Sequence, residues 1–138
     1  EAAEAMLTGS LFAGIAFSFA RLGNVHAMSH PVSAFFNVPH GVANGILFPY
    51  IVKYNEEAAF GKYQKIYNYI STEEKCESEF SKGMLNTQVG IPAKLSDAGV
   101  TDEYFAQMTE DAMKSGNIAI NPQKTVREDI LALYKEAL

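Results

Sequence analysis

The sequence predicts an all-α protein, and two observations support this fold class. Apolar residues recur at helical spacing through most of the chain, whereas the alternation typical of a half-buried strand does not persist over any long stretch. Helix-capping residues precede several of these apolar segments. With 138 residues, the chain has the size of one domain and can bury a hydrophobic core. We therefore expect about seven helices in a single all-helical domain over residues 1–138.

The first predicted helix covers Met6–Ala20 and is apolar on all sides, which is typical of a helix buried in a core. We do not interpret it as a membrane span, because glycine and hydroxyl side chains interrupt it and a span needs roughly 20 apolar residues. Gly23 is expected to end this helix as its C′ residue. After a stretch that contains the histidines, further helices are predicted over Pro39–Tyr54 and Glu57–Ile70.

The second half of the chain continues the helical pattern. A polar helix is predicted over Thr72–Thr87, where a capping threonine is followed by two glutamates. The stretch VGIPAKLSDAGV is punctuated by glycine and proline and is expected to be a loop. A further helix follows over Asp102–Lys114. The last helix is expected to begin at a capping box formed by Thr125 and Glu128.

Charge and cysteine content limit the classes of function. Sixteen acidic residues against eleven basic ones give a net charge of −5, which argues against a nucleic-acid-binding protein. Cys76 is the only cysteine, so an intrachain disulfide is impossible and a reducing, cytoplasmic location is the simplest interpretation. No residue pattern indicates a secretory signal, because acidic residues precede the first apolar segment.

All three histidines of the chain lie in one short stretch, NVHAMSHPVSAFFNVPHG. His26 and His30 are four residues apart, so on a helix they share one face. Pro31 either kinks that helix or ends it and opens the next one. His40 is expected in the first turn of the third helix, where the helix dipole disfavours a positively charged ring and leaves its lone pair available. From the residues alone, metal binding and ordinary packing remain equally open.

A longer stretch, GNVHAMSHPVSAFFNVPHGVANGILFPYIVKYN, resembles the histidine signature of the iron-containing (group III) alcohol dehydrogenases. The loop after residue 88 and the closing segment GNIAINPQKTVREDILALYKEAL also resemble the end of that family's sequences. The resemblance implies the all-helical, metal-binding C-terminal domain of a two-domain dehydrogenase. Within it, His26 and His40 match the two metal-ligand histidines, and His30 matches a catalytic histidine near the nicotinamide and substrate. Phe36 matches an aromatic residue that lines the substrate pocket.

The resemblance also implies a reaction and its cofactors. A divalent metal, Fe(II) or Zn(II), polarises the oxygen of a small alcohol, and hydride passes between the substrate and NAD or NADP. The dinucleotide is expected to bind mainly to an N-terminal domain that this chain lacks. The implied partners are a small alcohol or aldehyde, that missing domain and further copies of the chain in a homo-oligomer, without nucleic acid or membrane.

The chain departs from the whole enzyme in ways that indicate a fragment. The family takes further ligands from an upstream D-x-x-x-H motif, but every aspartate here lies after His40. A glycine-rich dinucleotide-binding turn is also missing, and no initiator methionine precedes Glu1. We therefore expect the chain alone to be inactive. Two alternatives remain open: a non-catalytic helical metal-binding or interaction module, and a plain helical scaffold with incidental histidines.

Overall fold

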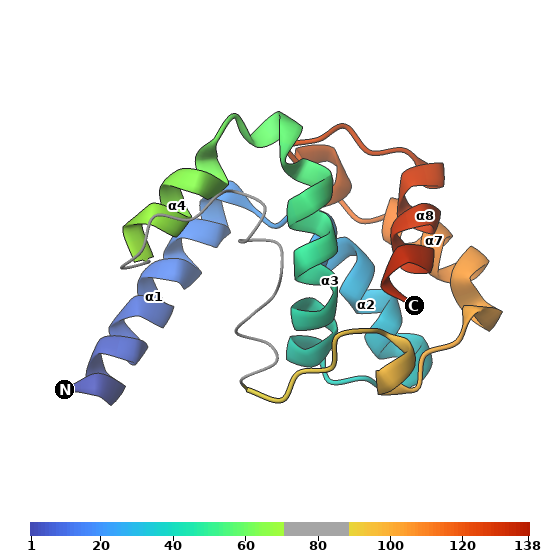
Figure 1. The fold of residues 1–138 in the computed structure, drawn as a ribbon, viewed down its shortest axis with the longest axis horizontal. Helices are drawn as coiled ribbons and strands as arrows, with labels where there is room; N and C mark the ends of the chain where they lie inside the picture. Colours follow the sequence, from blue (N-terminus) through green and yellow to red (C-terminus); the bar gives the residue numbers. More distant parts are fainter. Residues whose placement is uncertain (71–88) are drawn as a thin grey trace.

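The computed structural model describes residues 1–70 and 89–138, which form helices, turns and loops without a β-strand (Figure 1). The predicted all-α fold class is confirmed. The α-helices are α1 (Ala2–Ala20), α2 (Asn24–Phe36), α3 (His40–Asn55), α4 (Lys62–Ile70), α7 (Phe105–Met113) and α8 (Arg127–Ala137). Short 3-10 helices are η1 (Glu57–Ala59), η2 (Ser96–Ala98), η3 (Asp102–Tyr104) and η4 (Ile118–Ile120). The helix predicted over Thr72–Thr87 lies outside the described residues.

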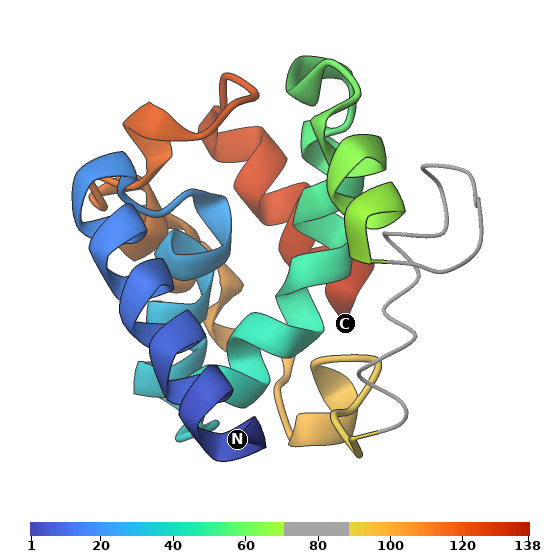
Figure 2. The same ribbon diagram turned by 90° about the vertical axis from the view of Figure 1, so that its left-hand side faces the viewer.

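The hydrophobic core lies between α2, α3, α7 and α8 (Figures 1 and 2). Tyr134 of α8 is fully buried there, and its ring stacks on Phe105 of α7 with the centroids 5.5 Å apart. Its hydroxyl donates a hydrogen bond to the carbonyl of Met28 in α2 over 2.7 Å. Burial raises the pKa of Tyr134 well above its usual range, so the hydroxyl remains a donor. Tyr134 therefore ties the last helix to the helix that carries two of the histidines.

A buried amide cluster, formed by Asn24, Asn55, Asn121 and Thr125, joins the start of α2, the end of α3 and the segment before α8. Asn121 Oδ1 accepts hydrogen bonds from the backbone N–H of Asn24 and from Asn55 Nδ2, each over 3.1 Å. Asn121 Nδ2 donates in turn to Asn55 Oδ1 over 2.7 Å. Thr125 Oγ1 accepts from Asn24 Nδ2 over 2.8 Å. One amide cluster therefore holds three segments that are far apart in the sequence.

The burial predicted for the first helix is wrong. The sequence predicts a core helix over Met6–Ala20, but no residue of α1 is buried, and Phe19 is 87% exposed. A helix that is apolar on all sides is expected to be buried, but the pattern does not indicate which element packs against it. None of the described elements buries a residue of α1, which extends away from the core helices toward the N-terminus (Figure 1). The length and composition of α1 would also allow it to cross a membrane. For a single helix near the N-terminus, this is weak evidence of a membrane span.

Two predicted helix ends are also wrong. Gly23 was expected to end the first helix, but α1 ends at Ala20 and Arg21 takes the left-handed conformation, with φ 62°. Gly23 instead precedes α2, where a Cβ atom would lie 2.8 Å from Asn121 Oδ1. The capping box of Thr125 and Glu128 is not formed, because the Thr125 hydroxyl belongs to the amide cluster. The Asp129 carboxylate accepts the N–H of Val126 instead, over 2.9 Å.

The structure decides whether α2 continues through Pro31, and it divides two of the predicted helices. α2 continues through Pro31, so this proline lies inside one helix rather than between two. The helix predicted over Glu57–Ile70 is split, because Phe60 and Gly61 both have positive φ and separate η1 from α4. The helix predicted over Asp102–Lys114 begins as η3 and continues as α7. α3 forms one unbroken helix that follows its predicted bounds to within one residue at each end.

We expect the isolated chain to self-associate in solution. The exposed apolar residues of α1 form a surface of the kind that drives association: Met6, Leu7, Leu11, Phe12, Ile15, Phe17 and Phe19. Replacing Leu11 and Phe12 together with glutamine should shift the chain toward smaller species, whereas Glu4→Gln on the same helix should not. Sedimentation velocity over a range of concentrations measures the difference. A wild-type chain that stays monomeric throughout would contradict this expectation.

Gly23→Ala is expected to destabilise the fold, because the new Cβ would overlap Asn121 Oδ1 in the amide cluster. Overpacking of this kind costs about 1–3 kcal/mol, measured as the free energy of unfolding in urea. Gly14→Ala is the matched control: apart from its chain neighbours and the backbone of its own helix, nothing lies within 4 Å of its new Cβ, and it occupies a helix interior. That change should be neutral or stabilising by up to about 1 kcal/mol. Equal unfolding free energies for the two variants would show that the cluster adjusts without cost.

Candidate metal centre

Helices α2 and α3 bring the three histidines together. His26 and His30 lie one turn apart on α2, and His40 is the first residue of α3. Asn37 takes the left-handed conformation at the end of α2, and the chain then turns into α3 within three residues. The ring centroids lie 5.1 Å apart for His30 and His40, 5.3 Å for His26 and His40, and 6.2 Å for His26 and His30. The cluster seen in the sequence is therefore also a cluster in space.

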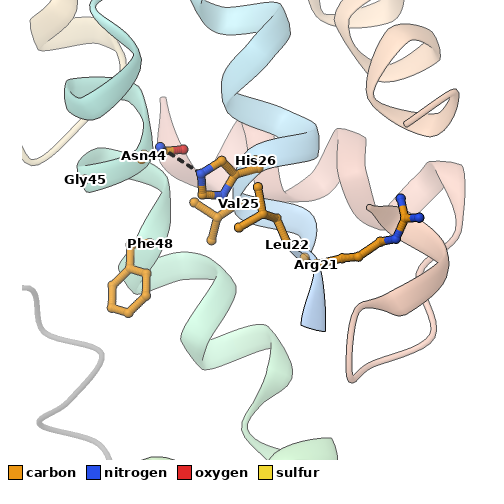
Figure 3. A pocket seen from close by; sticks show the side chains of 8 residues that line it. Arg21, Leu22, Val25, His26, Asn44, Gly45 and Phe48 are labelled. Carbon is orange, nitrogen blue, oxygen red and sulfur yellow. Dashed lines mark hydrogen bonds between the residues drawn. The ribbon is translucent and has the colours of Figure 1, made fainter. Parts of the chain in front are cut away.

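The Nε2 atoms of His26 and His40 both face the side-chain amide of Asn44. Asn44 Nδ2 lies 3.0 Å from His40 Nε2 and 3.4 Å from His26 Nε2. Figure 3 shows the contact between Asn44 and His26, which reaches from α3 to α2. An amide nitrogen can only donate, so with this amide orientation a hydrogen bond to either ring requires the tautomer whose Nε2 lone pair faces Asn44. The lone pairs of His26 and His40 therefore converge on a common position.

The surroundings of His26 favour its neutral form. Partial burial lowers the pKa of His26, and the neighbouring His40 and then His30 lower it further by charge repulsion. A neutral imidazole keeps the lone pair that a transition metal requires. Asn44 Oδ1 is buried beside these rings without a hydrogen-bond partner among the described residues. Imidazole nitrogens on two facing helices are donors that suit a divalent metal such as Fe(II) or Zn(II), which would have to displace Asn44 Nδ2 from the position that both Nε2 atoms face.

The described part of the chain provides an incomplete ligand set. Across residues 1–70 and 89–138, no group of three His, Cys, Asp or Glu side chains is arranged to hold a metal ion. His30 belongs to the cluster but differs from the other two histidines in its contacts. Its ring stacks on His40 with an interplanar angle of 28°, and it is exposed beside a cavity of about 210 Å³ that also reaches Asp111 and Ser115.

A larger pocket of about 450 Å³ opens beside His26 (Figure 3). Leu22, Val25 and Phe48 give its wall apolar side chains. His26, Asn44 and Arg21 add polar groups to the same wall. The size lies within the range of sites for small molecules. Apolar walls next to these polar groups can hold a short carbon chain with its polar end at His26 and Asn44.

Phe36, the residue predicted for the substrate pocket, lies elsewhere. It is at the last turn of α2, where its ring meets Tyr104 with the centroids 5.7 Å apart and packs against the hydrophobic core. It does not belong to the wall of the pocket beside His26. It lies six positions after His30, which places the two side chains on different faces of α2. Its predicted role therefore stays a prediction that the geometry beside His26 does not support.

Asn44 and Ser29 are site residues that the sequence pattern did not single out. Ser29 is fully buried, and its Oγ lies 3.5 Å from His40 Nδ1 and 3.4 Å from the carbonyl of His26. A usable signal existed for Asn44, because it follows His40 by four residues and so shares its helix face. No comparable signal marked Ser29, since it reaches His40 only through the packing of α2 on α3.

Comparisons with known proteins agree with this fold. The model of the Fe-containing alcohol dehydrogenase family, C-terminal, matches residues 1–138. The chain is 37% identical over 145 residues to 1,3-propanediol dehydrogenase of Klebsiella pneumoniae, with 99% of this chain and 38% of that protein covered. It is 38% identical over 148 residues to lactaldehyde reductase of Escherichia coli (strain K12), again with 99% and 38% covered. The crystal structure of a 1,3-propanediol oxidoreductase is similar, with a TM-score of 0.84 and 35% identity over 94% of this chain and 36% of that one.

The fold and the site together define an all-helical domain in which two helices share a group of histidines. The chain belongs to the iron-containing alcohol dehydrogenase family, and it corresponds to that family's C-terminal part. The resemblance found in the sequence is thereby confirmed. The chain spans 38% of the length of the two curated relatives, so the remaining part of such a protein is not represented in these 138 residues.

Proposed function

We propose that this chain is part of the helical, metal-binding C-terminal domain of a longer NAD- or NADP-linked alcohol dehydrogenase. The observation that carries the proposal is the convergence of His26 Nε2 and His40 Nε2 on Asn44 Nδ2, from two different helices. Membership of the family supplies the second support. In this proposal His26 and His40 hold the metal together with ligands from outside the chain, for which the family's D-x-x-x-H motif is the candidate.

The metal and the dinucleotide supply the chemistry that amino acids lack: a Lewis acid makes the alcohol hydroxyl more acidic, and a nicotinamide takes up the hydride. The residues of this chain bind, orient and move a proton. His26 and His40 offer imidazole nitrogens, a donor type that suits Fe(II) and Zn(II) about equally. His30 is exposed and stacked on His40, a position suited to passing a proton between the substrate oxygen and solvent.

The proposed substrates are small alcohols and the corresponding aldehydes or ketones. The names of the relatives, 1,3-propanediol dehydrogenase and lactaldehyde reductase, support this class. The pocket of about 450 Å³ beside His26 supports it as well, because Leu22, Val25 and Phe48 give it apolar walls. A cytoplasmic, homo-oligomeric enzyme without nucleic-acid or membrane partners completes the proposal.

Single alanine variants of the three histidines in the full-length enzyme test the assigned roles. His26→Ala and His40→Ala should each remove a metal ligand, so bound metal and turnover should be lost together. His30→Ala should keep its metal while turnover falls by roughly 10²–10⁴-fold, the usual contribution of a proton-transferring group. Elemental analysis beside steady-state kinetics distinguishes the cases. Loss of metal in His30→Ala, or full metal and activity in His40→Ala, would contradict the assignment.

The isolated 138-residue chain should not oxidise alcohols with NAD or NADP. The reasons are the incomplete ligand set in the described residues and the missing dinucleotide-binding pattern. The measurement is the absorbance of the reduced nicotinamide at high protein concentration, with His26→Ala prepared in parallel as a control for contaminating enzyme. Turnover by the wild-type chain that disappears in the control variant would contradict the fragment interpretation. The expected absence of turnover would make a non-catalytic metal-binding module the best description of the chain by itself.

A further inference from the structure

Arg21 has a backbone conformation that arginine rarely adopts. Its φ of 62° and ψ of −170° lie in a region that is almost exclusive to glycine, because a Cβ atom is crowded there. The N–H of Arg21 donates to the carbonyl of Phe17 over 2.7 Å, at the end of α1. Three residues later, Asn121 holds the backbone N–H of Asn24. The turn between α1 and α2 is therefore fixed at both ends, and it would be less strained with glycine at position 21.

Arg21 also lies where two cavities meet. Arg21 and Leu22 both line the pocket of about 450 Å³ beside His26. A second cavity, of about 310 Å³, is lined by the same two residues and by Phe17, Ser18 and Asn117. Figure 3 shows the side chain of Arg21 extending away from His26 and Asn44. A molecule that begins at His26 and passes Leu22 would therefore reach Arg21 with its far end.

The charge of Arg21 is not used within the fold. Its side chain is exposed and has no hydrogen-bond or ion-pair partner in the part of the chain that the structure describes. The other arginine of the chain, Arg127, is paired with Glu110. A guanidinium presents a planar fork of N–H donors that matches a carboxylate. A free guanidinium at a cavity wall is therefore suited to the anionic group of a ligand.

We propose that Arg21 is a specificity-determining residue that binds a carboxylate on the substrate. The preferred substrates are then short hydroxy acids and the corresponding oxo acids. This inference rests on the proposed function, because it names a class among the small alcohols and aldehydes. The reacting oxygen would lie at the histidines, the carbon chain would pass Leu22, and the carboxylate would lie at Arg21. Strained backbone is common at sites that hold a ligand in this way.

Steady-state kinetics on the full-length enzyme test the proposal. The probes are 3-hydroxypropanoate and 4-hydroxybutanoate, each compared with the uncharged alcohol of the same length, 1-propanol or 1-butanol. Arg21→Gln removes the charge and keeps a side chain of similar length. The ratio of kcat/KM for the hydroxy acid to kcat/KM for the alcohol should fall by roughly 10–100-fold, mainly through KM for the hydroxy acid, because a hydrogen bond to a charged group is lost. Arg127→Gln is the matched control and should leave the ratio unchanged, since Arg127 lines neither cavity.

An unchanged ratio in Arg21→Gln would overturn the inference. A wild-type enzyme that oxidises the alcohols but neither hydroxy acid would overturn it as well. If Arg21→Gln raises KM for NAD or NADP and leaves the ratio unchanged, the guanidinium binds a phosphate of the dinucleotide instead of the substrate. A wild-type enzyme that oxidises neither class of compound would contradict the proposed function itself, so the two failures can be distinguished.

Urea unfolding of the 138-residue chain tests the strain separately. Arg21→Gly and Arg21→Gln both lack the guanidinium, but only glycine relieves the backbone at this position. We expect a higher midpoint of unfolding for Arg21→Gly than for Arg21→Gln. In the full-length enzyme both variants should show the same loss of preference for the hydroxy acids. A midpoint for Arg21→Gly that is no higher would contradict the strain from which the inference starts and would overturn it.

Discussion

The hydrogen bonds of Asn121 are the constraint on which the arrangement of the two histidine-bearing helices depends. Its amide oxygen is shared by the backbone of Asn24 and the side chain of Asn55, which mark the start of α2 and the end of α3. Every group of this buried side chain has its partner within the amide cluster or its immediate loop. Removing such a partner would leave buried polar groups unpaired at about 1–3 kcal/mol each, so the geometry is strongly specified. Together with the direct packing of α2 on α3, it fixes the relative placement of His26 and His40.

The sequence predicted the fold class well because helical periodicity is a local property. The range of α3 and the first-turn position of His40 needed only local patterns and came out nearly as expected. The burial of α1 could not be predicted, since a helix that is apolar all round does not indicate what covers it. Gly23 and Thr125 were assigned to helix ends by local rules, but both belong to the long-range amide cluster. Contacts across about a hundred residues leave no local signal.

The candidate site was predictable in its histidines and unpredictable in its neighbours. His26, His30 and His40 are so close in the sequence that two adjacent helices bring them together almost unavoidably. Their separate roles came from the family resemblance and not from spacing. Ser29 contacts His40 because α2 packs against α3. The geometry of that packing cannot be read from the sequence pattern. The position of the Phe36 ring could not be predicted from the sequence pattern either: at the end of α2 it contacts Tyr104.

His26 and His40 lie on two different helices, and this affects the energetics of folding. A metal ion held by His26 and His40 would act as a cross-link between α2 and α3, and the unfolded chain could not form that link with comparable affinity. Ligand binding to the native state alone adds about 2.7 kcal/mol of stability when the free ion exceeds its Kd a hundredfold. Metal supply in the cell would then govern how much of the protein persists, as well as how fast it works.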